Sequence, residues 1–366
     1  MVKREDQITA YQAAVFVSSF MLGVGILILP RSVSEVVNSP DGWISLLLSG
    51  LFVILISIIM IKLCQRFPRK NFFEFSQEIV GKWAGGILNF ILIAYFIMAA
   101  GFEIRGMAEV TKLFLLPATP IFATIIPFIC LGTYLITGGI NPIARFFELM
   151  LPITIIVLIL VFALSIKSFD IHNLLPVMGS EIWPVIKGGK ATFLSLTGFE
   201  VMLIITAFMK EPHKAVKTTI IGITIPVIVY LVAIICTIGN LGVEGTNIRT
   251  WPTVSLMREF EYPGILFERF ETFLLAVWII QIFTTFVSCY YFAALGLSQL
   301  FKKDNSLFIF SLAPLIYLVT RLPKNINDLF HFATFESSII ILFVVLILPT
   351  LLIIDVFRRK KKVSIS

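Results

Sequence analysis

The stretch Met21-Leu22-Gly23-Val24-Gly25-Ile26, followed by Pro30, interrupts the first long apolar run of the chain. A second interruption, Ser195-Leu196-Thr197-Gly198-Phe199-Glu200, lies in the sixth apolar run. Glycine accepts backbone angles that other residues resist, so a helix can unwind at such a position. Each interruption is therefore predicted to divide one apolar helix into two half-helices.

The two interruptions fall at matching distances from the predicted helix starts. Gly23 lies 14 residues after Thr9, a residue type favoured at a helix N-cap. Gly198 lies 14 residues after Pro184, and proline suits the first turn of a helix. Half-helices are expected to end before Gly23 and before Gly198, and to begin again just after Gly25 and just after Gly198.

The composition of the chain is that of a membrane protein. Of its 366 residues, 58 % are hydrophobic and only 14 % are charged, and the mean hydropathy is +0.98. Soluble globular proteins are about 45–50 % apolar and about 25 % charged. The composition excludes a soluble enzyme, a disordered chain and a disulfide scaffold. Because the apolar runs are continuous rather than alternating, it also argues against a membrane β-barrel.

Apolar runs bounded by charged residues, Pro or Gly predict ten transmembrane helices in a single domain, residues 1–366. They lie near 9–30, 42–61, 83–111, 120–137, 147–166, 191–209, 218–240, 270–300, 305–320 and 334–357. Divided five and five, the halves 9–166 and 184–357 have opposite orientations in the membrane, because five is odd. The predicted fold is all-α and polytopic, with ten helices in a 5+5 inverted repeat whose helices 1 and 6 are broken.

Lys and Arg are denser in the N-terminal segment, in the loops after helices 2, 4, 6 and 8, and in the C-terminal segment. The positive-inside rule then predicts that both termini are cytoplasmic. The basic tail, residues 358–366, suits an anionic inner leaflet, and it equally suits a simple stop-transfer anchor. With its charge arranged in this way, the chain is expected to contact the lipid bilayer and not nucleic acid.

Unwound backbone inside a membrane needs a partner, because hydrocarbon cannot satisfy the freed N–H and C=O groups. Such backbone survives at membrane depth only where it lines a cavity or meets a ligand. The starting end of a half-helix favours an anion and the finishing end favours a cation. A zwitterionic amino acid offers both charges. The breaks therefore predict a small-ligand site whose backbone amides stay unpaired until a ligand binds. The alternative is that the glycines only let helices pack closely.

Several polar side chains lie inside the predicted spans. Glu103 and Arg105 in the third span are two residues apart, do not share a helix face, and are each expected to find a partner on another helix. They are interpreted either as a packing pair or as coupling charges. Glu200 follows the second break. It is interpreted either as an acid that complements the positive helix end, or as a group that attracts a substrate ammonium or carries a proton.

The eighth span carries a polar stripe at helical spacing, formed by Gln281, Thr285 and either Ser288 or Cys289. Thr285 is placed near mid-membrane, where it binds a ligand or bonds back to its own helix. The outer loop 241–269 is interpreted as a short interfacial helix that caps the bundle, or as a partner surface. The sequence carries no phosphate-binding loop, metalloprotease motif or nucleophile elbow, so we expect no enzyme activity, no cofactor and no metal.

These stretches resemble a known family. The broken spans look like those of the amino acid–polyamine–organocation transporters, which have a LeuT-like fold. The chain resembles more closely, over essentially its whole length, the B subunit of spore nutrient-germinant receptors. The stretches that carry the resemblance are 21–30, Pro40-Asp41-Gly42-Trp43, 102–109, Trp251-Pro252-Thr253, 268–271, 278–281 and 284–286.

The resemblance implies a location in the inner membrane of the dormant spore. It also implies two partners, a membrane A subunit and a C-subunit lipoprotein, and a small nutrient ligand such as an amino acid whose binding triggers germination. Carried onto this chain, the implied ligand-binding residues are Gly23, Gly25, Tyr95, Thr197, Gly198, Thr285 and Cys289. The competing functions are a proton-coupled secondary transporter of amino acids and a structural subunit with an inactive pocket.

Overall fold

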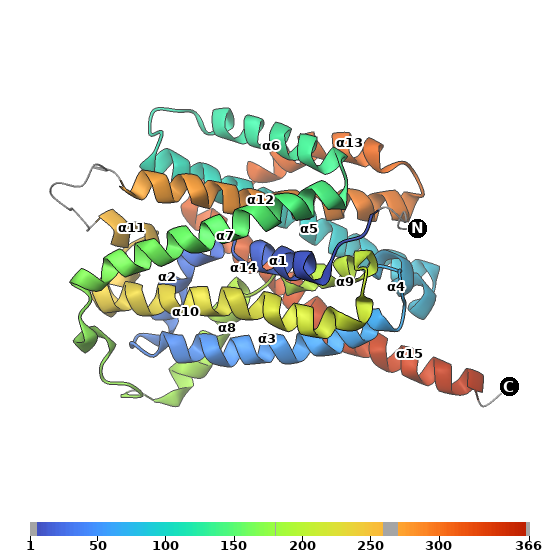
Figure 1. Ribbon diagram of the computed structural model, residues 1–366, viewed down its shortest axis with the longest axis horizontal. Coiled ribbons are helices and arrows are strands. Elements are labelled where there is room, and N and C mark those ends of the chain that lie inside the picture. The colour runs from blue at the N-terminus through green and yellow to red at the C-terminus, as the bar shows by residue number, and fades with distance from the viewer. Residues whose placement is uncertain (1–5, 180, 259–269, 364–366) are drawn as a thin grey trace.

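The computed structural model describes residues 6–179, 181–258 and 270–363, and within them the regular secondary structure is helical apart from one isolated β-bridge between Ile8 and Met209. Figure 1 shows the helices running roughly parallel or antiparallel along one axis. Their bounds are α1 (Ala10–Met21), α2 (Gly25–Val37), α3 (Gly42–Gln65), α4 (Phe72–Val80), α5 (Lys82–Phe114), α6 (Ile121–Thr137), α7 (Ile140–Ser165), α8 (Ile182–Ser195), α9 (Met202–Ile205), α10 (Ala215–Ile248), α11 (Pro252–Arg258), α12 (Phe270–Phe301), α13 (Asn305–Thr320), α14 (Ile326–Leu342) and α15 (Leu348–Val363).

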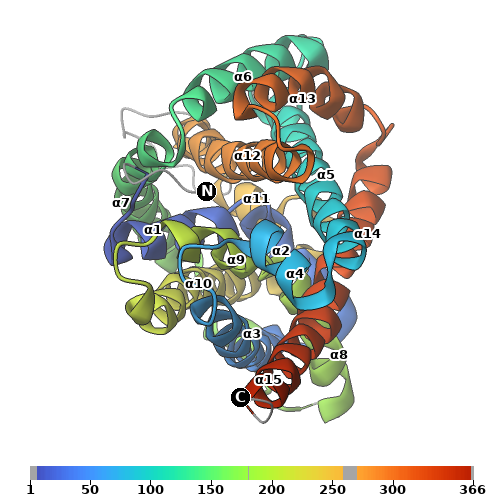
Figure 2. The same ribbon diagram turned by 90° about the vertical axis from the view of Figure 1, so that its right-hand side faces the viewer.

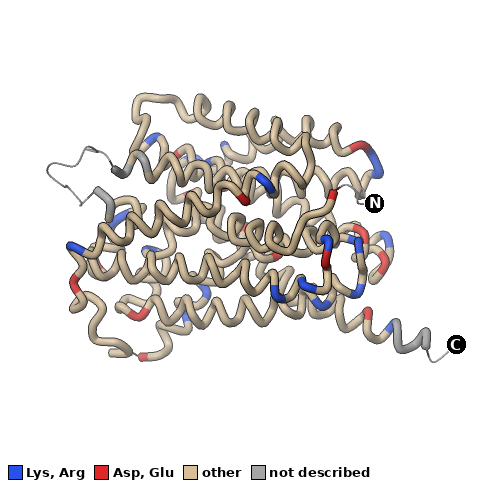
Figure 3. The backbone as a smooth tube through the Cα atoms, viewed as in Figure 1, with Lys and Arg blue, Asp and Glu red and all other residues tan. Residues whose placement is uncertain are grey.

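The lengths and compositions of these helices are those of a multi-pass membrane protein. Among the described residues, six helical segments are long and apolar enough to cross a bilayer, and two further spans result if each of two bent helix pairs is one crossing. The helices α6 and α13 are apolar but shorter, so the predicted total of ten spans stays a prediction. Figure 3 shows most charged residues toward the two ends of the bundle, with a largely uncharged middle.

The first predicted break is present. Thr9 caps α1 through a capping box with Gln12, as its residue type predicted. The helix ends at Met21, and α2 begins at Gly25 with its axis bent by 55°. Pro30 lies inside α2, in its second turn. Proline has no backbone N–H, so the helix lacks one hydrogen-bond donor near its start.

The second predicted break is also present, with two differences. The helix α8 begins at Ile182 rather than at Pro184, and it ends at Ser195. Gly198 adopts φ +123°, a region that favours glycine, and the axis bends by 46°. Beyond it the chain forms short 3₁₀ and α segments over Phe199–Phe208 rather than one continuous half-helix.

Other differences concern lengths and short elements. The amphipathic helix α4 was not predicted, and α10 runs to Ile248 with a kink at Gly242, where φ is +67°. The last predicted span is two helices joined by a π-helical segment, Phe343–Ile347. The predicted capping helix in the outer loop corresponds to α11, which packs against α2, whereas residues 259–269 of that loop lie outside the described residues.

The first broken helix lies in the middle of the bundle, and the second begins at its edge with α8. Figure 2 shows α1 and α2 between an outer pair, α6 with α13, and an opposite edge formed by α3, α8 and α15. The helix α12 packs along α5, α10 packs along α3 and α1, and α2 lies against α8. The start of α1 and the end of α15 lie at the same end of the bundle, on the right in Figure 1.

Close packing between α1 and α10 requires glycine at position 222. A Cβ at Gly222 would lie 2.8 Å from Val17 Cβ and 3.0 Å from the Ala14 carbonyl oxygen. We expect Gly222→Val to destabilise the protein by about 1–3 kcal/mol through overpacking. Thermal unfolding of the detergent-purified protein measures this.

The control is Gly86→Val, because a Cβ at Gly86 would meet only Leu300 Cδ1 at 3.9 Å. Equal melting temperatures for the two variants would contradict the packing argument.

Candidate ligand site at the two helix breaks

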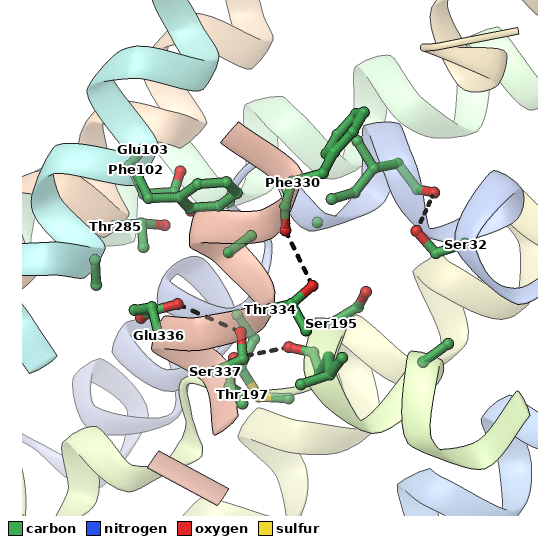
Figure 4. A pocket seen from close by; sticks show the side chains of 18 of the residues that line it. Ser32, Phe102, Glu103, Ser195, Thr197, Thr285, Phe330, Thr334, Glu336 and Ser337 are labelled. Atoms are coloured by element: carbon green, nitrogen blue, oxygen red, sulfur yellow. Dashed lines mark hydrogen bonds between the residues drawn. The ribbon is translucent and has the colours of Figure 1, made fainter. Parts of the chain in front are cut away.

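A cavity of about 320 Å³ lies where the two broken helices meet α5, α12 and α14. Five of the seven predicted ligand-binding residues line it: Gly23, Gly25, Tyr95, Thr197 and Thr285. Gly198 and Cys289 do not line it, although both are close neighbours of residues that do, and Cys289 is completely buried. A volume of this size lies at the small end of the range for ligand pockets. Figure 4 shows the lining side chains.

The carbonyl groups freed at the end of α1 are bound by side chains of α10 and α12. Gln281 Nε2 donates to the Ser19 carbonyl oxygen at 2.6 Å, and Thr284 Oγ1 donates to the same oxygen at 3.2 Å. The Tyr230 hydroxyl donates to the carbonyl oxygen of Met21. This end of the break is therefore satisfied within the protein, as buried backbone in a membrane requires.

Thr285 bonds to the first break rather than to its own helix. Its Oγ1 donates to the Phe20 carbonyl oxygen at 3.0 Å, and the side chain is 4 % exposed. It therefore holds the end of α1 while it faces the cavity. A ligand that contacts Thr285 would contact a residue that positions the break.

The N–H group at the start of α2 is capped by Glu103. Val24 N–H donates to both carboxyl oxygens of Glu103, at 3.3 and 3.2 Å. Glu103 is 6 % exposed and comes from α5, so it has found the partner on another helix that the sequence predicted. It is also a wall of the cavity.

The second break is capped in the same manner by Glu200. Gly198 N–H donates to Glu200 Oε2 at 2.7 Å, and the Tyr95 hydroxyl donates to Glu200 Oε1 at 2.5 Å. The prediction that free amides wait for a ligand is therefore wrong for Val24 and Gly198. The reason is physical: an unpaired N–H at this depth costs about 1–3 kcal/mol, and an internal carboxyl oxygen removes that cost.

Arg105 differs from Glu103. Its guanidinium pairs with Glu109 on its own helix, with Nη2 2.7 Å from Oε1. It also donates to the carbonyl oxygens of Thr320, the last residue of α13, and of Lys324, which lies beyond that helix. Some partners of Arg105 therefore lie on its own helix and some on another segment. Arg105 does not line the cavity.

The helix α14 contributes a wall that the sequence analysis did not single out. Its residues Phe330, Thr334, Glu336 and Ser337 line the cavity. An acidic residue inside an apolar run is itself a signal of function in a membrane protein. Glu336 carries that signal in the tenth predicted span.

The rim of the cavity carries an ion pair. Arg31 Nε lies 2.7 Å from Glu35 Oε1, and both residues lie on α2 with partly exposed side chains. The Arg31 guanidinium also lies over the Phe330 ring, 5.9 Å from its centroid. Within the described residues, no three His, Cys, Asp or Glu side chains are grouped as ligands for a metal ion.

Comparison with known proteins places this arrangement in a family. The Spore_permease family model, described as spore germination protein, matches residues 7–329. The chain belongs to the spore germination protein family. It is 44 % identical to spore germination protein YndE of Bacillus subtilis (strain 168), with 99 % of both chains covered. It is 36 % identical to spore germination protein A2 of the same organism, over 98 % of this chain and 97 % of that protein.

Solved structures show that this family member has the LeuT-like transporter fold. Mhp1, a nucleobase-cation-symport-1 family transporter, gives a TM-score of 0.69 at 15 % identity, covering 92 % of this chain and 76 % of Mhp1. MhsT in complex with L-phenylalanine gives a TM-score of 0.64 at 14 % identity, covering 93 % of this chain and 90 % of MhsT. Both are likenesses of fold. The chain is therefore a permease-like membrane protein of the spore germination family.

Proposed function

We propose that this chain is the nutrient-binding subunit of a germinant receptor in the spore inner membrane. A small nutrient, such as an amino acid, binds in the cavity between the two helix breaks. The observation that carries the proposal is this cavity, because its walls are the unwound segments themselves. A ligand there contacts both half-helix junctions at once, so it can bias the bundle between two states.

The proposed receptor has an inverted-repeat architecture and works with partners. Residues 9–166 and 184–357 are the two repeats, each beginning with a broken helix. Both termini are cytoplasmic, so the rim with Arg31 and Glu35, at the opposite end of the bundle from the termini, faces outward. A membrane A subunit and a C-subunit lipoprotein receive the change of state and pass it on.

The test of the proposed site is Thr285→Leu. The substitution removes the hydrogen bond to the Phe20 carbonyl oxygen and adds apolar volume inside the cavity. We expect the nutrient concentration that gives half-maximal germination to rise about tenfold or more, which corresponds to about 1.4 kcal/mol of binding energy. Dose–response curves of spores carrying equal amounts of receptor measure this.

The control is Thr350→Leu, at an exposed threonine of α15 outside the cavity. An unchanged dose response in the Thr285→Leu spores would contradict the site.

A second function is favoured by the likeness to solved transporters. A proton-coupled amino acid transporter would use the same cavity and move its substrate through the bundle. Purified protein in sealed vesicles separates the two functions. Saturable uptake of a labelled amino acid that an uncoupler collapses indicates transport. Ligand binding with no uptake indicates a receptor.

A further inference from the structure

Three buried carboxyl groups without a basic partner lie at or near the cavity, and two of them, Glu103 and Glu336, line it. Glu103, Glu200 and Glu336 are 6 %, 0 % and 5 % exposed, and they come from α5, the second break and α14. Within the described part of the chain, no Lys, Arg or His lies in ion-pair distance of any of them. The basic side chain in the cavity wall, Arg31, is paired with Glu35.

Both oxygens of two of these three carboxyl groups accept hydrogen bonds within the protein. Glu103 accepts from Val24 N–H with both oxygens. Glu200 accepts from the N–H of Gly198 with one oxygen and from the Tyr95 hydroxyl with the other. Each of them caps a backbone N–H at a helix break, so a ligand that bound there would share a group that already holds the break.

Glu336 differs because the protein leaves half of it unused. Its Oε2 accepts from Ser337 Oγ at 3.3 Å. Its Oε1 has no hydrogen-bond partner among the described residues, although the side chain is buried to 95 % and forms part of the cavity wall. Figure 4 shows Glu336 on the same side of the cavity as Thr285 and Glu103.

A buried polar group with an unused acceptor is costly, and a charged one more so. Glu336 also lies near enough to Glu200 and Glu103 for their charges to interact. A ligand that brings a positive charge and N–H donors removes both costs at once. A ligand carboxylate would add a fourth acidic group to the same space.

We propose that Glu336 binds the ammonium group of the ligand, and that the ligand class is defined by this ammonium rather than by a carboxylate. The proposal rests on the proposed function and deepens it. Because Glu103 already caps Val24 N–H, the site does not need a ligand carboxylate at the first break. Small primary amines that keep the side chain of an amino acid ligand but lack its carboxylate are therefore also expected to bind.

The experiment uses the purified full-length protein in lipid nanodiscs. The probes are the twenty common L-amino acids, and then, for each one that binds, its C-terminal amide and its 2-hydroxy acid. We expect the amide to bind within about tenfold of the amino acid, the hydroxy acid at least a hundredfold more weakly, and Glu336→Gln to weaken the amino acid at least tenfold. Calorimetry or thermal shift measures each affinity.

The matched control is Glu148→Gln, in a span but outside the cavity, where Glu148 accepts from Gln12 Nε2. Its affinities should equal those of the wild type. Normal amino acid binding by Glu336→Gln, or tight binding of the hydroxy acid, overturns the ammonium proposal and leaves the proposed function intact. Binding of no amino acid to the wild type overturns both. Stabilisation of the wild type by sodium chloride but not by choline chloride, lost in Glu336→Gln, overturns it in favour of a monovalent cation.

Discussion

Gly198→Ala is expected to destabilise the protein severely. Gly198 has φ +123°, which an L side chain rarely adopts. A Cβ there would also lie 2.8 Å from Phe20 Cδ1 and 2.9 Å from Met21 Cγ, so the second break would be forced away from the first. Backbone strain and overpacking together are expected to cost about 3 kcal/mol or more. Thermal unfolding in detergent and the amount of receptor in spores measure the loss.

The matched control for Gly198 is Gly81→Ala. Gly81 has φ +89°, but a Cβ there would meet nothing within 4 Å. This variant should lose only the backbone contribution, about 1–3 kcal/mol, because its φ of 89° and ψ of 168° lie in a region almost confined to glycine. The difference between the two variants then reports the contact between the breaks. If the two variants lose the same stability, that contact does not hold the breaks together.

The positions of both breaks follow from the sequence because their cause is local. Gly198 has a φ of +123°, which favours glycine, and the start of α1 is set by a local capping box at Thr9. The continuous apolar runs likewise predict spans without knowledge of the packing. The helix α4 was not predicted from apolar runs, because its 9 residues are too few for a membrane span.

What satisfies the first break does not follow from the sequence, whereas the cap of the second, Glu200, is two residues from Gly198. Val24 and Glu103 are separated by 79 residues, and Tyr95 and Glu200 by 105 residues. No local pattern pairs residues so far apart, because their meeting depends on how α5 packs against the broken helices. The sequence offered the adjacent helix end as one partner of Glu200, but it did not identify Tyr95 or the partner of Glu103. It left Glu336 unmarked altogether, because the tenth span was identified by its apolar residues.

The role of Glu103 is decided by two substitutions at one position. Glu103→Leu removes both acceptors of Val24 N–H and leaves a buried amide without a partner. We expect a loss of about 2–3 kcal/mol of unfolding free energy, together with loss of the nutrient response. Glu103→Gln keeps one acceptor oxygen at nearly the same place. Because either oxygen of Glu103 lies within reach of Val24 N–H, the glutamine variant is expected to stay within about 1 kcal/mol of the wild type.

Comparison of the two variants separates capping from coupling. If Glu103 acts as a cap, the glutamine variant keeps both its melting temperature and its germination dose response, and only the leucine variant loses them. If Glu103 acts through its charge, both variants fail in germination although the glutamine variant remains folded. The first result is expected, because the carboxyl group lies against the start of α2 with no basic residue in ion-pair distance in the described part of the chain. A folded, unresponsive glutamine variant would therefore exclude a purely structural role for Glu103.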